Sequence, residues 1–419
     1  MSSGLMLPPP PDPARAKRRA RAERVVLLYS PRYESLCNLV AAHRSRDTLL
    51  YALLSACNVT SLLRVVAPAA APAELLSSFH DPKYLVALQE PPTDDIDALD
   101  ELGLVDDCPV FDGLWQYCSA VVGASLQGAS MLMRGQADVA INWGGGRHHA
   151  KKAEAAGFCY VNDCVVAILH LLKKFRRVLY LDLDVHHPDG VESAFYTSDR
   201  VLCISVHKHC RGFYPGTGVA SDTGAGAGKG FTLNLPLSKD GVGDVPFCRL
   251  VTEAVAAADH HFAPEALVLQ CGADALAGDP LGGFGLTTAG LQRCVERVAA
   301  LRRPLLLLGG GGYAPAAAAR LWTVLTAAAV GPHAVAALPA EVPEHEHFPS
   351  YGPDFKLHTP PRPESSGRDG NAPEVVQQLV DRCREALRAT TRRTAANGGK
   401  KPAPAAAVVP AAAAEVAAA

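Results

Sequence analysis

Three polar side chains, Asp182, Asp184 and His186, alternate with apolar residues along one short segment. Successive side chains of a strand point to opposite faces, so these three share one face. A carboxylate and an imidazole that converge in this way suit a borderline metal such as zinc. Asp274, after another apolar segment, would supply a third ligand, and three protein ligands leave a position for water, as in catalytic zinc sites. The structural alternative is that Asp184 and His186 only cap the next helix.

A tandem pair, His148 and His149, follows three consecutive glycines. Glycine allows the backbone to approach a ligand closely and to adopt positive φ. A single histidine is more often structural than catalytic, but an adjacent pair beside a metal site favours proton transfer. Asp182 and Asp189 are not needed as metal ligands here. Either carboxylate would accept the second ring N–H of a histidine, which fixes its tautomer and raises its basicity.

Four consecutive glycines, Gly309–Gly312, precede Tyr313. The segment lacks the Lys and Ser/Thr of a P-loop and the spacing of a dinucleotide-binding loop. We interpret it as a flexible turn that presents the Tyr313 hydroxyl to the site, where a phenol can donate a hydrogen bond to a developing oxyanion. A surface tyrosine after a turn is the alternative.

Most of these residues follow short apolar segments that have the length of buried strands. The expected strands are Val25–Tyr29, Val139–Trp143, Val178–Leu183, Val201–Val206, Phe231–Leu235, Ala266–Cys271 and Pro304–Leu308. Helical patterns lie near residues 47–57, 112–134, 162–175, 246–262, 287–301, 315–329 and 372–389. This alternation predicts an α/β fold: a single domain with a central, mostly parallel sheet and helices on both faces. Ligands of such sheets bind beyond the carboxyl ends of the strands, so we expect the active site there.

Low-complexity segments divide the 419-residue chain into three regions. We expect a disordered basic arm at 1–23, a catalytic domain at 24–390 and a disordered Ala/Pro/Lys-rich tail at 391–419. The basic residues of the arm are either a nuclear-localisation signal or a solvated charge run. We expect the protein in the nucleus and also in the cytoplasm.

Charge and cysteine content exclude several classes of protein. Lys+Arg 40 against Asp+Glu 42 gives a net charge of -2, which excludes a global basic field, and we expect no direct sequence-specific nucleic-acid binding. No apolar stretch of about 18 residues is free of charge and proline, so no membrane partner is expected, and the N-terminus lacks the pattern of a secretory signal. The 12 cysteines form no C-x-x-C pair, which favours buried reduced thiols over a disulfide framework.

Longer motifs contain these residues and resemble the signatures of the zinc-dependent histone deacetylases. They are Asn142-Trp-Gly-Gly-Gly-Arg-His-His-Ala-Lys-Lys continuing to Gly-Phe-Cys-Tyr-Val-Asn-Asp163, Tyr180-Leu-Asp-Leu-Asp-Val-His-His187, Phe213-Tyr-Pro-Gly-Thr-Gly218, Gln270-Cys-Gly-Ala-Asp274, Gly278-Asp-Pro280 and Gly309-Gly-Gly-Gly-Tyr313. The resemblance runs from about residue 24 to the segment 352–358 and through the last expected helix. It is nearest to class I and, within it, to the short eight-type branch.

The resemblance implies an arginase/deacetylase-type fold and hydrolysis of Nε-acetyl-lysine on histones and other proteins. The implied role is transcriptional repression in chromatin, with corepressor proteins as further partners. By motif position, Asp184, His186 and Asp274 would hold zinc, or Fe²⁺ in its place. A monovalent cation, K⁺ or Na⁺, would be bound by Asp182, Asp184, His186 and Ser205.

The resemblance also assigns roles in catalysis. His149 is similar to the general base that activates the metal-bound water, and His148 to its electrostatic partner. Asp189 and Asp182 would orient these two histidines. Tyr313 is similar to the donor that stabilises the transition state.

The same motifs imply a narrow channel for acyl-lysine. The backbone of Gly157, the side chains of Phe158 and Tyr214, and Tyr313 would line it. Asp107 matches the rim carboxylate that accepts backbone N–H groups of the substrate.

Four positions and one segment depart from the family pattern. Pro188 replaces a glycine, Arg147 an apolar residue, Tyr214 a phenylalanine and Val219 an aspartate, and the segment 282–285 differs as a whole. None of the departures removes a metal ligand or a proton carrier. They concern loop geometry, rate and acyl preference.

Three other functions share parts of this pattern. An arginase-like two-manganese hydrolase needs Asp-x-Asp where this chain has Gly272 before Asp274, so one metal is favoured. An acetylpolyamine-type amidohydrolase uses the same ligands, but Asp107 and the segment 352–358 favour the histone-type branch. A weakly catalytic acetyl-lysine-binding scaffold in a repressor complex is disfavoured by the intact set of ligands, histidines and tyrosine.

Overall fold

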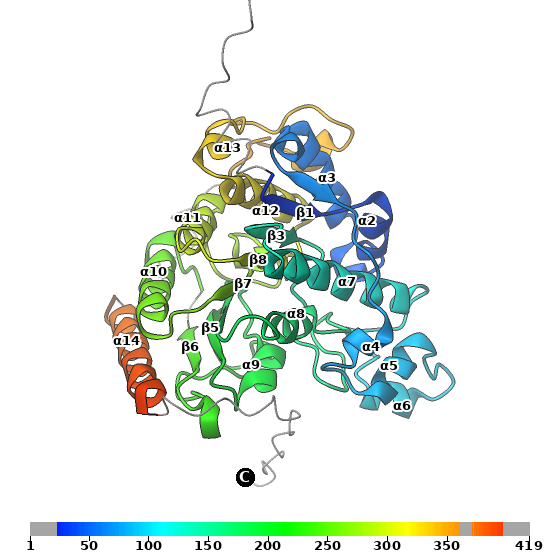
Figure 1. Cartoon of the computed structure of the whole chain (residues 1–419). Coiled ribbons are helices and arrows are strands. Elements are labelled where there is room, and N and C mark those ends of the chain that lie inside the picture. Colours follow the sequence, from blue (N-terminus) through cyan, green and yellow to red (C-terminus); the bar gives the residue numbers. More distant parts are fainter. Residues whose placement is uncertain (1–22, 239, 360–370, 372, 397–419) are drawn as a thin grey trace, which may run out of the picture.

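The computed structural model describes residues 23–238, 240–359, 371 and 373–396. Most of the predicted arm, and the predicted tail beyond 396, lie outside the described residues, so the three-region division stays a prediction. Eight strands form one central sheet (Figure 1). They are β1 (Val25–Leu28), β2 (Arg64–Val66), β3 (Val139–Asn142), β4 (Val178–Asp182), β5 (Val201–Lys208), β6 (Thr232–Leu237), β7 (Ala266–Gln270) and β8 (Leu305–Leu308). Their order is β2-β1-β3-β8-β7-β4-β5-β6, and all pairings of the described strands are parallel.

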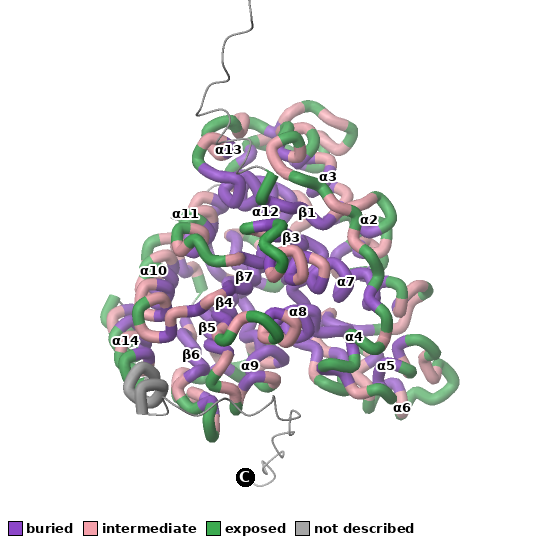
Figure 2. The backbone as a smooth tube through the Cα atoms, in the orientation of Figure 1, coloured by how far each residue is buried: buried purple, intermediate pink, exposed green. Residues whose placement is uncertain are grey.

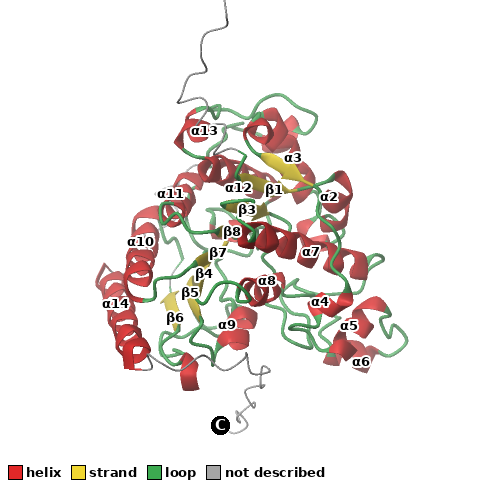
Figure 3. Cartoon of the chain, in the orientation of Figure 1, coloured by secondary structure: helices red, strands yellow, loops and turns green. Residues whose placement is uncertain are grey.

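Helices cover both faces of this sheet (Figure 3). The α-helices are α2 (Pro31–Cys37), α3 (Arg46–Ala56), α4 (Ala73–Leu76), α5 (Pro82–Gln89), α6 (Ile96–Glu101), α7 (Leu114–Met133), α8 (Asp163–Leu171), α9 (Asp189–Phe195), α10 (Asp244–His261), α11 (Thr288–Ala299), α12 (Pro315–Val330), α13 (Pro332–Ala336) and α14 (Pro373–Ala396). Short 3-10 helices are η1 (Ala41–His43), η2 (Val59–Leu62), η3 (Gly226–Gly228), η4 (Ala273–Ala275) and η5 (Phe348–Tyr351). No helix among the described residues is long and apolar enough to cross a bilayer.

Alternate residues of the strands enter two hydrophobic cores. In β4, Leu179 and Leu181 belong to the core formed with α3, α10, α11, α12 and α14. Val178 and Tyr180 belong to the core formed with α2, α7, α8 and α9. Figure 2 shows the resulting buried centre of the molecule. A strand buried on both faces gives a continuous apolar segment, which is why these strands can be recognised in the sequence.

The predicted α/β fold is confirmed, and all seven expected strands occur with ends shifted by at most about two residues. Strand β2 was not expected, because Arg64 and Val65 are exposed at the sheet edge and the segment lacks an apolar pattern. Helices α2, α4, α5, α6, α9 and α13 were also missed. Each has eight residues or fewer, which is too short to display a helical period clearly.

The carboxyl ends of β3, β8, β7 and β4 lie side by side at one edge of the sheet. The register pairs Asn142 with Leu308, Leu308 with Gln270, and Gln270 with Asp182. These four residues are the last of their strands. The turns that follow therefore start at the same level, and their polar residues meet beyond the sheet edge.

Two tryptophans pack beneath these turns. Trp143, directly after β3, stacks on Trp322 of α12 with ring centroids 5.5 Å apart and planes inclined by 8°. Both side chains are completely buried. The indole N–H of Trp143 donates to Thr326 Oγ1 at 3.0 Å, and that of Trp322 donates to the carbonyl of Cys271 at 2.8 Å. The stack thereby joins the start of the histidine-bearing turn to the start of the turn that carries Asp274.

Candidate active site

Asp184, His186 and Asp274 meet at the carboxyl edge of the sheet, as the strand-end pattern predicted. One ligand atom from each residue lies within 4.8 Å of the others, and all three residues are buried. The Nδ1 atom of His186 lies 3.1 Å from Asp184 Oδ1 and 3.0 Å from Asp274 Oδ2. The capping alternative does not describe the site, because α9 starts at Asp189 after Pro188 without a side-chain cap.

The surroundings of the two carboxylates fit a divalent cation. A Cβ atom at Gly272 would lie 2.2 Å from Asp184 Oδ2, and one at Gly311 would lie 2.0 Å from Asp274 Oδ2. Glycine is thus what allows two turns to enclose the carboxylates. Burial and the charge of Asp184 raise the pKa of Asp274 to about 8. Two buried carboxylates whose oxygens lie within 4.8 Å of each other ionise together only when a positive charge lies between them. Two carboxylate oxygens and one imidazole nitrogen are a ligand set that suits Zn²⁺.

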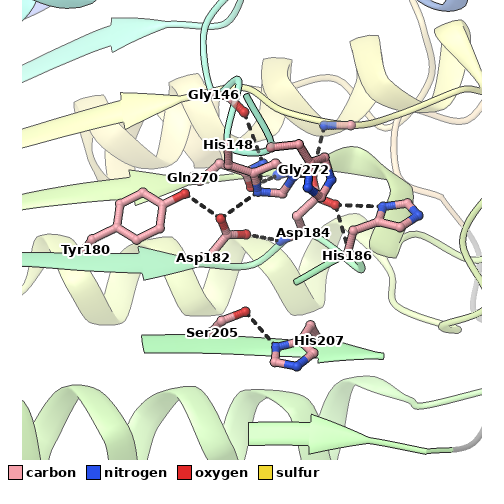
Figure 4. A network of polar contacts seen from close by, with 12 residues as sticks. Gly146, His148, Tyr180, Asp182, Asp184, His186, Ser205, His207, Gln270 and Gly272 are labelled. Carbon is pink, nitrogen blue, oxygen red and sulfur yellow. Dashed lines mark hydrogen bonds and ion pairs between the residues drawn. The ribbon is translucent and has the colours of Figure 1, made fainter. Parts of the chain in front are cut away.

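Neighbouring groups hold the ligands in place. Asp184 Oδ2 accepts hydrogen bonds from the Gln270 side-chain amide at 2.8 Å and from the Gly311 N–H at 2.9 Å. Asp274 Oδ1 accepts from the Val185 N–H at 3.1 Å. Figure 4 shows Gln270 reaching Asp184 from the neighbouring strand. Sequence reasoning missed Gln270, although a single polar residue at the end of an apolar strand was the available signal.

Each histidine of the tandem pair contacts its own carboxylate. His148 Nδ1 lies 2.8 Å from Asp182 Oδ2, and His149 Nδ1 lies 2.8 Å from Asp189 Oδ1. The two imidazole rings are 4.0 Å apart between centroids. Lys151 forms an ion pair with the other oxygen of Asp189. The structure therefore brings together both histidines and both carboxylates that the sequence had grouped.

The two histidines have opposite protonation preferences. Burial alone lowers the pKa of His148, but the charges of Asp182 and Asp184 outweigh burial and raise it to about 9. Burial and the charge of His148 lower the pKa of His149 to about 3, against the opposing effect of Asp189. Near neutral pH, His149 is neutral and its Nδ1–H faces Asp189, so the lone pair on Nε2 can accept a proton.

The turn that carries the histidines is held by Asp163 at the start of α8. Its carboxylate accepts from the N–H of Gly146 at 3.1 Å and of Arg147 at 2.8 Å. The hydroxyl of Ser125 in α7 donates to the same group at 2.5 Å. Asp163 is the last residue of the motif that starts at Asn142, but it was not predicted as a site residue. Its role depends on folding of a segment some twenty residues away, which local sequence does not reveal.

A pocket of about 300 Å³ lies next to the ligand group and has His186 in its lining. It is lined by Asp107, His149, Gly157, Phe158, His186, Phe213, Tyr214, Leu281 and Tyr313. All five residues predicted for substrate binding are among them. Gly157 has φ +56°, and a Cβ there would lie 2.5 Å from His149 Cδ2, so glycine leaves room for the histidine. Phe213 and Leu281 were not predicted; Phe213 stacks on His186 with centroids 5.1 Å apart.

Asp107 is one of the residues that line the pocket. Its Oδ2 accepts a hydrogen bond from the Gly157 N–H at 2.9 Å, so the rim carboxylate is tied to the channel wall. Tyr214, which departs from the usual phenylalanine, is 42% exposed. The ring of Tyr214 packs edge-on against His149 with centroids 4.9 Å apart, as a channel wall would.

Tyr313 lines the pocket, so the surface-tyrosine alternative is wrong. Burial and the nearby charges of Asp274 and Asp184 raise the pKa of its hydroxyl well above the usual value, which keeps the phenol protonated. The Tyr313 N–H donates to Asp279 Oδ2 at 2.8 Å. The ring packs against Phe158 at 5.5 Å between centroids.

A second buried polar group lies behind the Gly309–Tyr313 turn. We call it the interior arginine cluster: His43, Arg46, Asp47 and Arg147, all at most 2% exposed. Arg46 Nη1 donates to the carbonyls of Gly310 at 3.0 Å and Gly312 at 3.2 Å. Arg147 donates to the carbonyl of Gly144 and, through Nη1, to His43 Nδ1 at 3.2 Å. The ring of His43 stacks on Tyr313 with centroids 5.8 Å apart.

The remaining predicted residue, Ser205, lies in β5 beside Asp182 of β4 in the sheet register. Its hydroxyl contacts His207 Nδ1 at 2.8 Å (Figure 4).

Two of the departures from the family pattern are Pro188 and Val219. Pro188 precedes α9, and its carbonyl accepts a hydrogen bond from the Glu192 N–H at 2.9 Å. Val219 is 39% exposed, and nothing in the structure explains its replacement of an aspartate.

An all-parallel sheet with a buried Asp/His/Asp group and paired histidines at its carboxyl edge defines the arginase/deacetylase class of metal-dependent hydrolases. Residues 40–329 match the sequence profile of the histone deacetylase domain. The chain belongs to the histone deacetylase family. The predicted resemblance is thereby confirmed.

Relatives of known name cover most of the chain. Histone deacetylase 8 of Danio rerio is 41% identical over 366 residues, which are 86% of this chain and 94% of that protein. Histone deacetylase 8 of Xenopus tropicalis is 42% identical over 360 residues, 85% of this chain and 95% of that protein. Histone deacetylase 1 of Homo sapiens is 43% identical over 350 residues, 83% of this chain and 70% of that protein.

Proposed function

We propose that this protein is a metal-dependent deacetylase that hydrolyses Nε-acetyl-lysine in histone tails and in other acetylated proteins. The observation that carries the proposal is a pocket lined by His149, Tyr313 and His186, in which His186 also belongs to the group formed with Asp184 and Asp274. An acyl-lysine side chain that enters this pocket brings its amide to the metal ligands, a base and a phenol at once.

For the metal we propose Zn²⁺ held by Asp184, His186 and Asp274, with Fe²⁺ as the alternative ion. When bound, the ion would polarise the amide carbonyl and lower the pKa of a water. The two carboxylates and the imidazole supply three ligands, which leaves room for both water and substrate. Gln270 and Gly311 keep Asp184 oriented toward the site.

For proton transfer we assign His149 as the general base. Its low pKa keeps it neutral, and Asp189 holds its Nδ1–H, so Nε2 is directed to accept a proton from water. The proton is then available on His149 for the leaving lysine amine. His148, kept protonated by Asp182, supplies a fixed positive charge beside the reacting amide.

For the substrate we assign the ring of Phe158, the ring of Tyr214 and the backbone of Gly157 as channel walls. The Tyr313 hydroxyl donates to the carbonyl oxygen as it becomes an oxyanion. Asp107 has one oxygen bonded to Gly157, which leaves the other for backbone N–H groups of the substrate.

A monovalent cation, K⁺ or Na⁺, is proposed beneath the metal site. Asp182, Asp184, His186 and Ser205 would bind it, the first three through backbone oxygens. The adjacency of β4 and β5 in the sheet supports this grouping, since Ser205 is paired with Asp182.

We also propose that the protein acts in the nucleus, as a repressor of transcription with corepressor partners, and that a further fraction is cytoplasmic. The basic residues near the N-terminus support this location. Imaging of the full chain and of a variant with these basic residues replaced by glutamine tests it: loss of nuclear accumulation is expected.

The activity is tested with purified full-length protein by combining metal analysis with turnover of three substrate types. We expect about one zinc or iron ion per chain, and turnover of acetyl-lysine peptides above that of acetylated polyamines. Peptides whose lysine carries an acyl group longer than acetyl should react more slowly than acetyl-lysine peptides. Preference for acetylpolyamines would replace the proposal with the amidohydrolase alternative, and peptide binding without turnover would replace it with the scaffold alternative.

A further inference from the structure

Two cysteines lie in contact on the face of the molecule that α10 and α11 cover. Cys248 is in the first turns of α10 and Cys294 is in α11. Their Sγ atoms are 3.7 Å apart, and both thiols are free. A disulfide has an S–S length of about 2.05 Å, so the sulfurs need to approach by less than about 2 Å. Because the two residues are 46 positions apart, no C-x-x-C spacing marks the pair in the sequence.

Hydrogen bonds and an ion pair connect α10 and α11 next to the two cysteines, which keeps the two thiols in contact. Asp244, the first residue of α10, accepts hydrogen bonds from Thr287 N–H at 2.9 Å and Thr287 Oγ1 at 2.7 Å. Arg293 of α11 forms an ion pair with the same carboxylate at 3.2 Å. A Cβ at Gly290 would lie 2.1 Å from Asp244 Oδ1, so glycine permits this close approach of the helix ends.

The two thiols differ in reactivity. Cys248 is half-buried, whereas Cys294 is 2% exposed. The Cys294 S–H donates to Cys248 Sγ. This hydrogen bond and the guanidinium of Arg293 lower the pKa of Cys248 to about 7. The accessible thiol is therefore the one that forms a thiolate near neutral pH, and the buried thiol stands behind it.

We propose that Cys248 and Cys294 are an oxidative modification site, in which a peroxide converts the two thiols to a disulfide that joins α10 to α11. The Cys248 thiolate attacks one peroxide oxygen, the O–O bond breaks, and a sulfenic acid and one water form. Cys294 then attacks the sulfenic sulfur, the S–O bond breaks, and a second water leaves. Overall, two thiols lose two hydrogens and two electrons, and one hydrogen peroxide becomes two waters.

The disulfide would act on the segment between Asp274 and α11, which includes Leu281 of the pocket. Gly241 N–H donates to the Gly283 carbonyl at 2.7 Å, and Gly285 N–H donates to the Val242 carbonyl at 2.8 Å. This segment is thus anchored on the residues directly before α10. This segment is held by the residues before α10 at one side and continues into α11 at the other. A disulfide between α10 and α11 would therefore fix the relative position of the two helices on either side of the segment.

The experiment treats the reduced, metal-loaded full chain with hydrogen peroxide and maps tryptic fragments without reduction. Joined fragments 240–249 and 294–297, each with one cysteine, are the expected product. Thermal unfolding of the oxidised protein should shift upward by about 5 °C, because the link restrains the unfolded chain. Peroxide treatment that leaves these fragments unlinked while Cys248 becomes sulfinic acid would overturn the proposal, as would a link to a different cysteine.

Variants separate the two roles. In Cys294→Ser, the Cys248 sulfenic acid should persist and be trapped by dimedone. In Cys248→Ser, Cys294 should stay reduced. Cys210→Ser is the matched control, since Cys210 is also half-buried but outside the pair, and it should link as the wild type does. Failure of Cys210→Ser to link would also contradict the assignment.

One measurement does not depend on variants that must fold. Burial raises the pKa of the half-buried Cys57 to about 12. In the wild-type protein at pH 7, iodoacetamide should therefore alkylate Cys248 at least about 10-fold faster than Cys57. Equal rates would contradict the reactivity on which the proposal depends. The test uses no acetylated substrate, so its failure leaves the proposed deacetylase function standing.

Discussion

The Gly309–Tyr313 turn has a buried polar group on each side, and the two groups are built differently. On one side, the Gly311 N–H faces Asp184 of the metal site, where each carboxylate has hydrogen-bond donors. On the other, the carbonyls of Gly310 and Gly312 face Arg46 of the interior arginine cluster. Within the described part of the chain, Arg46 Nε and Nη2, both carboxylate oxygens of Asp47 and His43 Nε2 have no hydrogen-bond partner.

The metal site is organised for a reaction, whereas the interior arginine cluster lowers the free energy of unfolding. A buried polar atom without a hydrogen bond costs about 1–3 kcal/mol, and more if it is charged. The metal site avoids this cost by satisfying its ligands, and the bound ion would balance their charge. The interior arginine cluster instead supports the turn from behind through Arg46 and His43. Substitutions on the two sides should therefore differ in kind as well as in size.

The largest effect is expected from Asp274→Asn. Two remaining ligands should not retain the ion, because catalytic zinc sites use three. Metal content and deacetylation should be lost together, while the fold persists. The measurement is plasma emission for zinc beside peptide turnover. Near-normal zinc content in this variant would show that Asp274 is not a ligand.

Removal of the general base should come next. His149→Ala should lower kcat by about 10²- to 10⁴-fold, since the proton from water then lacks an acceptor. His148→Ala, which removes a fixed charge but no proton acceptor, should lower kcat less. Steady-state kinetics of the two variants under one set of conditions check this order. Equal losses, or a larger loss for His148→Ala, would mean that the roles are shared or reversed.

Tyr313→Phe keeps the ring on the turn and removes only the hydroxyl. Loss of one oxyanion donor typically costs about 10²- to 10³-fold in kcat. KM should change far less, because Phe158 and Tyr214 make the ground-state contacts. Zinc content should stay at the wild-type level. Turnover within a few-fold of wild type in the metal-loaded variant would leave the turn with a structural role only.

The smallest effect is expected on the far side of the turn. Arg147→Leu removes a buried guanidinium and its hydrogen bonds to Gly144 and His43. The Gly144 carbonyl and His43 Nδ1 lose their donors, and a buried polar atom without a hydrogen bond costs about 1–3 kcal/mol, so Tm should fall. Loss of the His43 contact should reduce kcat by less than about 10-fold, with zinc retained. A loss as large as that of Tyr313→Phe would place Arg147 in the reaction itself.

The two groups also differ in how far sequence could predict them. Asp184, His186, Asp274 and Tyr313 each follow an apolar strand, so the topology rule for parallel sheets was enough to group them. The strands themselves were recognisable because both faces are buried. The tandem histidines stood out by their adjacency, and the geometry then assigned one carboxylate to each.

The interior arginine cluster had no comparable signal. His43 and Arg46 precede and begin α3, whereas Arg147 lies about a hundred residues later, and their contact exists only in the folded chain. Arg147 was noted as a departure, but its partners could not be inferred. Asp163 and Phe213 were missed for the same reason, because each contacts residues that are distant in sequence. Asp163 accepts hydrogen bonds from Gly146 and Arg147, and Phe213 stacks on His186. Short elements such as β2 and α9 carry too few residues for a period.

The parallel stack of Trp143 and Trp322 should give a spectroscopic signal that reports on the turns of the active site. Two indoles held 5.5 Å apart at 8° are close enough for their electronic transitions to couple, and such rigid burial produces near-ultraviolet circular dichroism that disappears when packing is lost. The guanidinium of Arg46 lies 4.6 Å above Trp322. The third tryptophan, Trp115, lies outside the stack at the start of α7. Rearrangement of the turns around the ligands should therefore register as a change in this band, without any label.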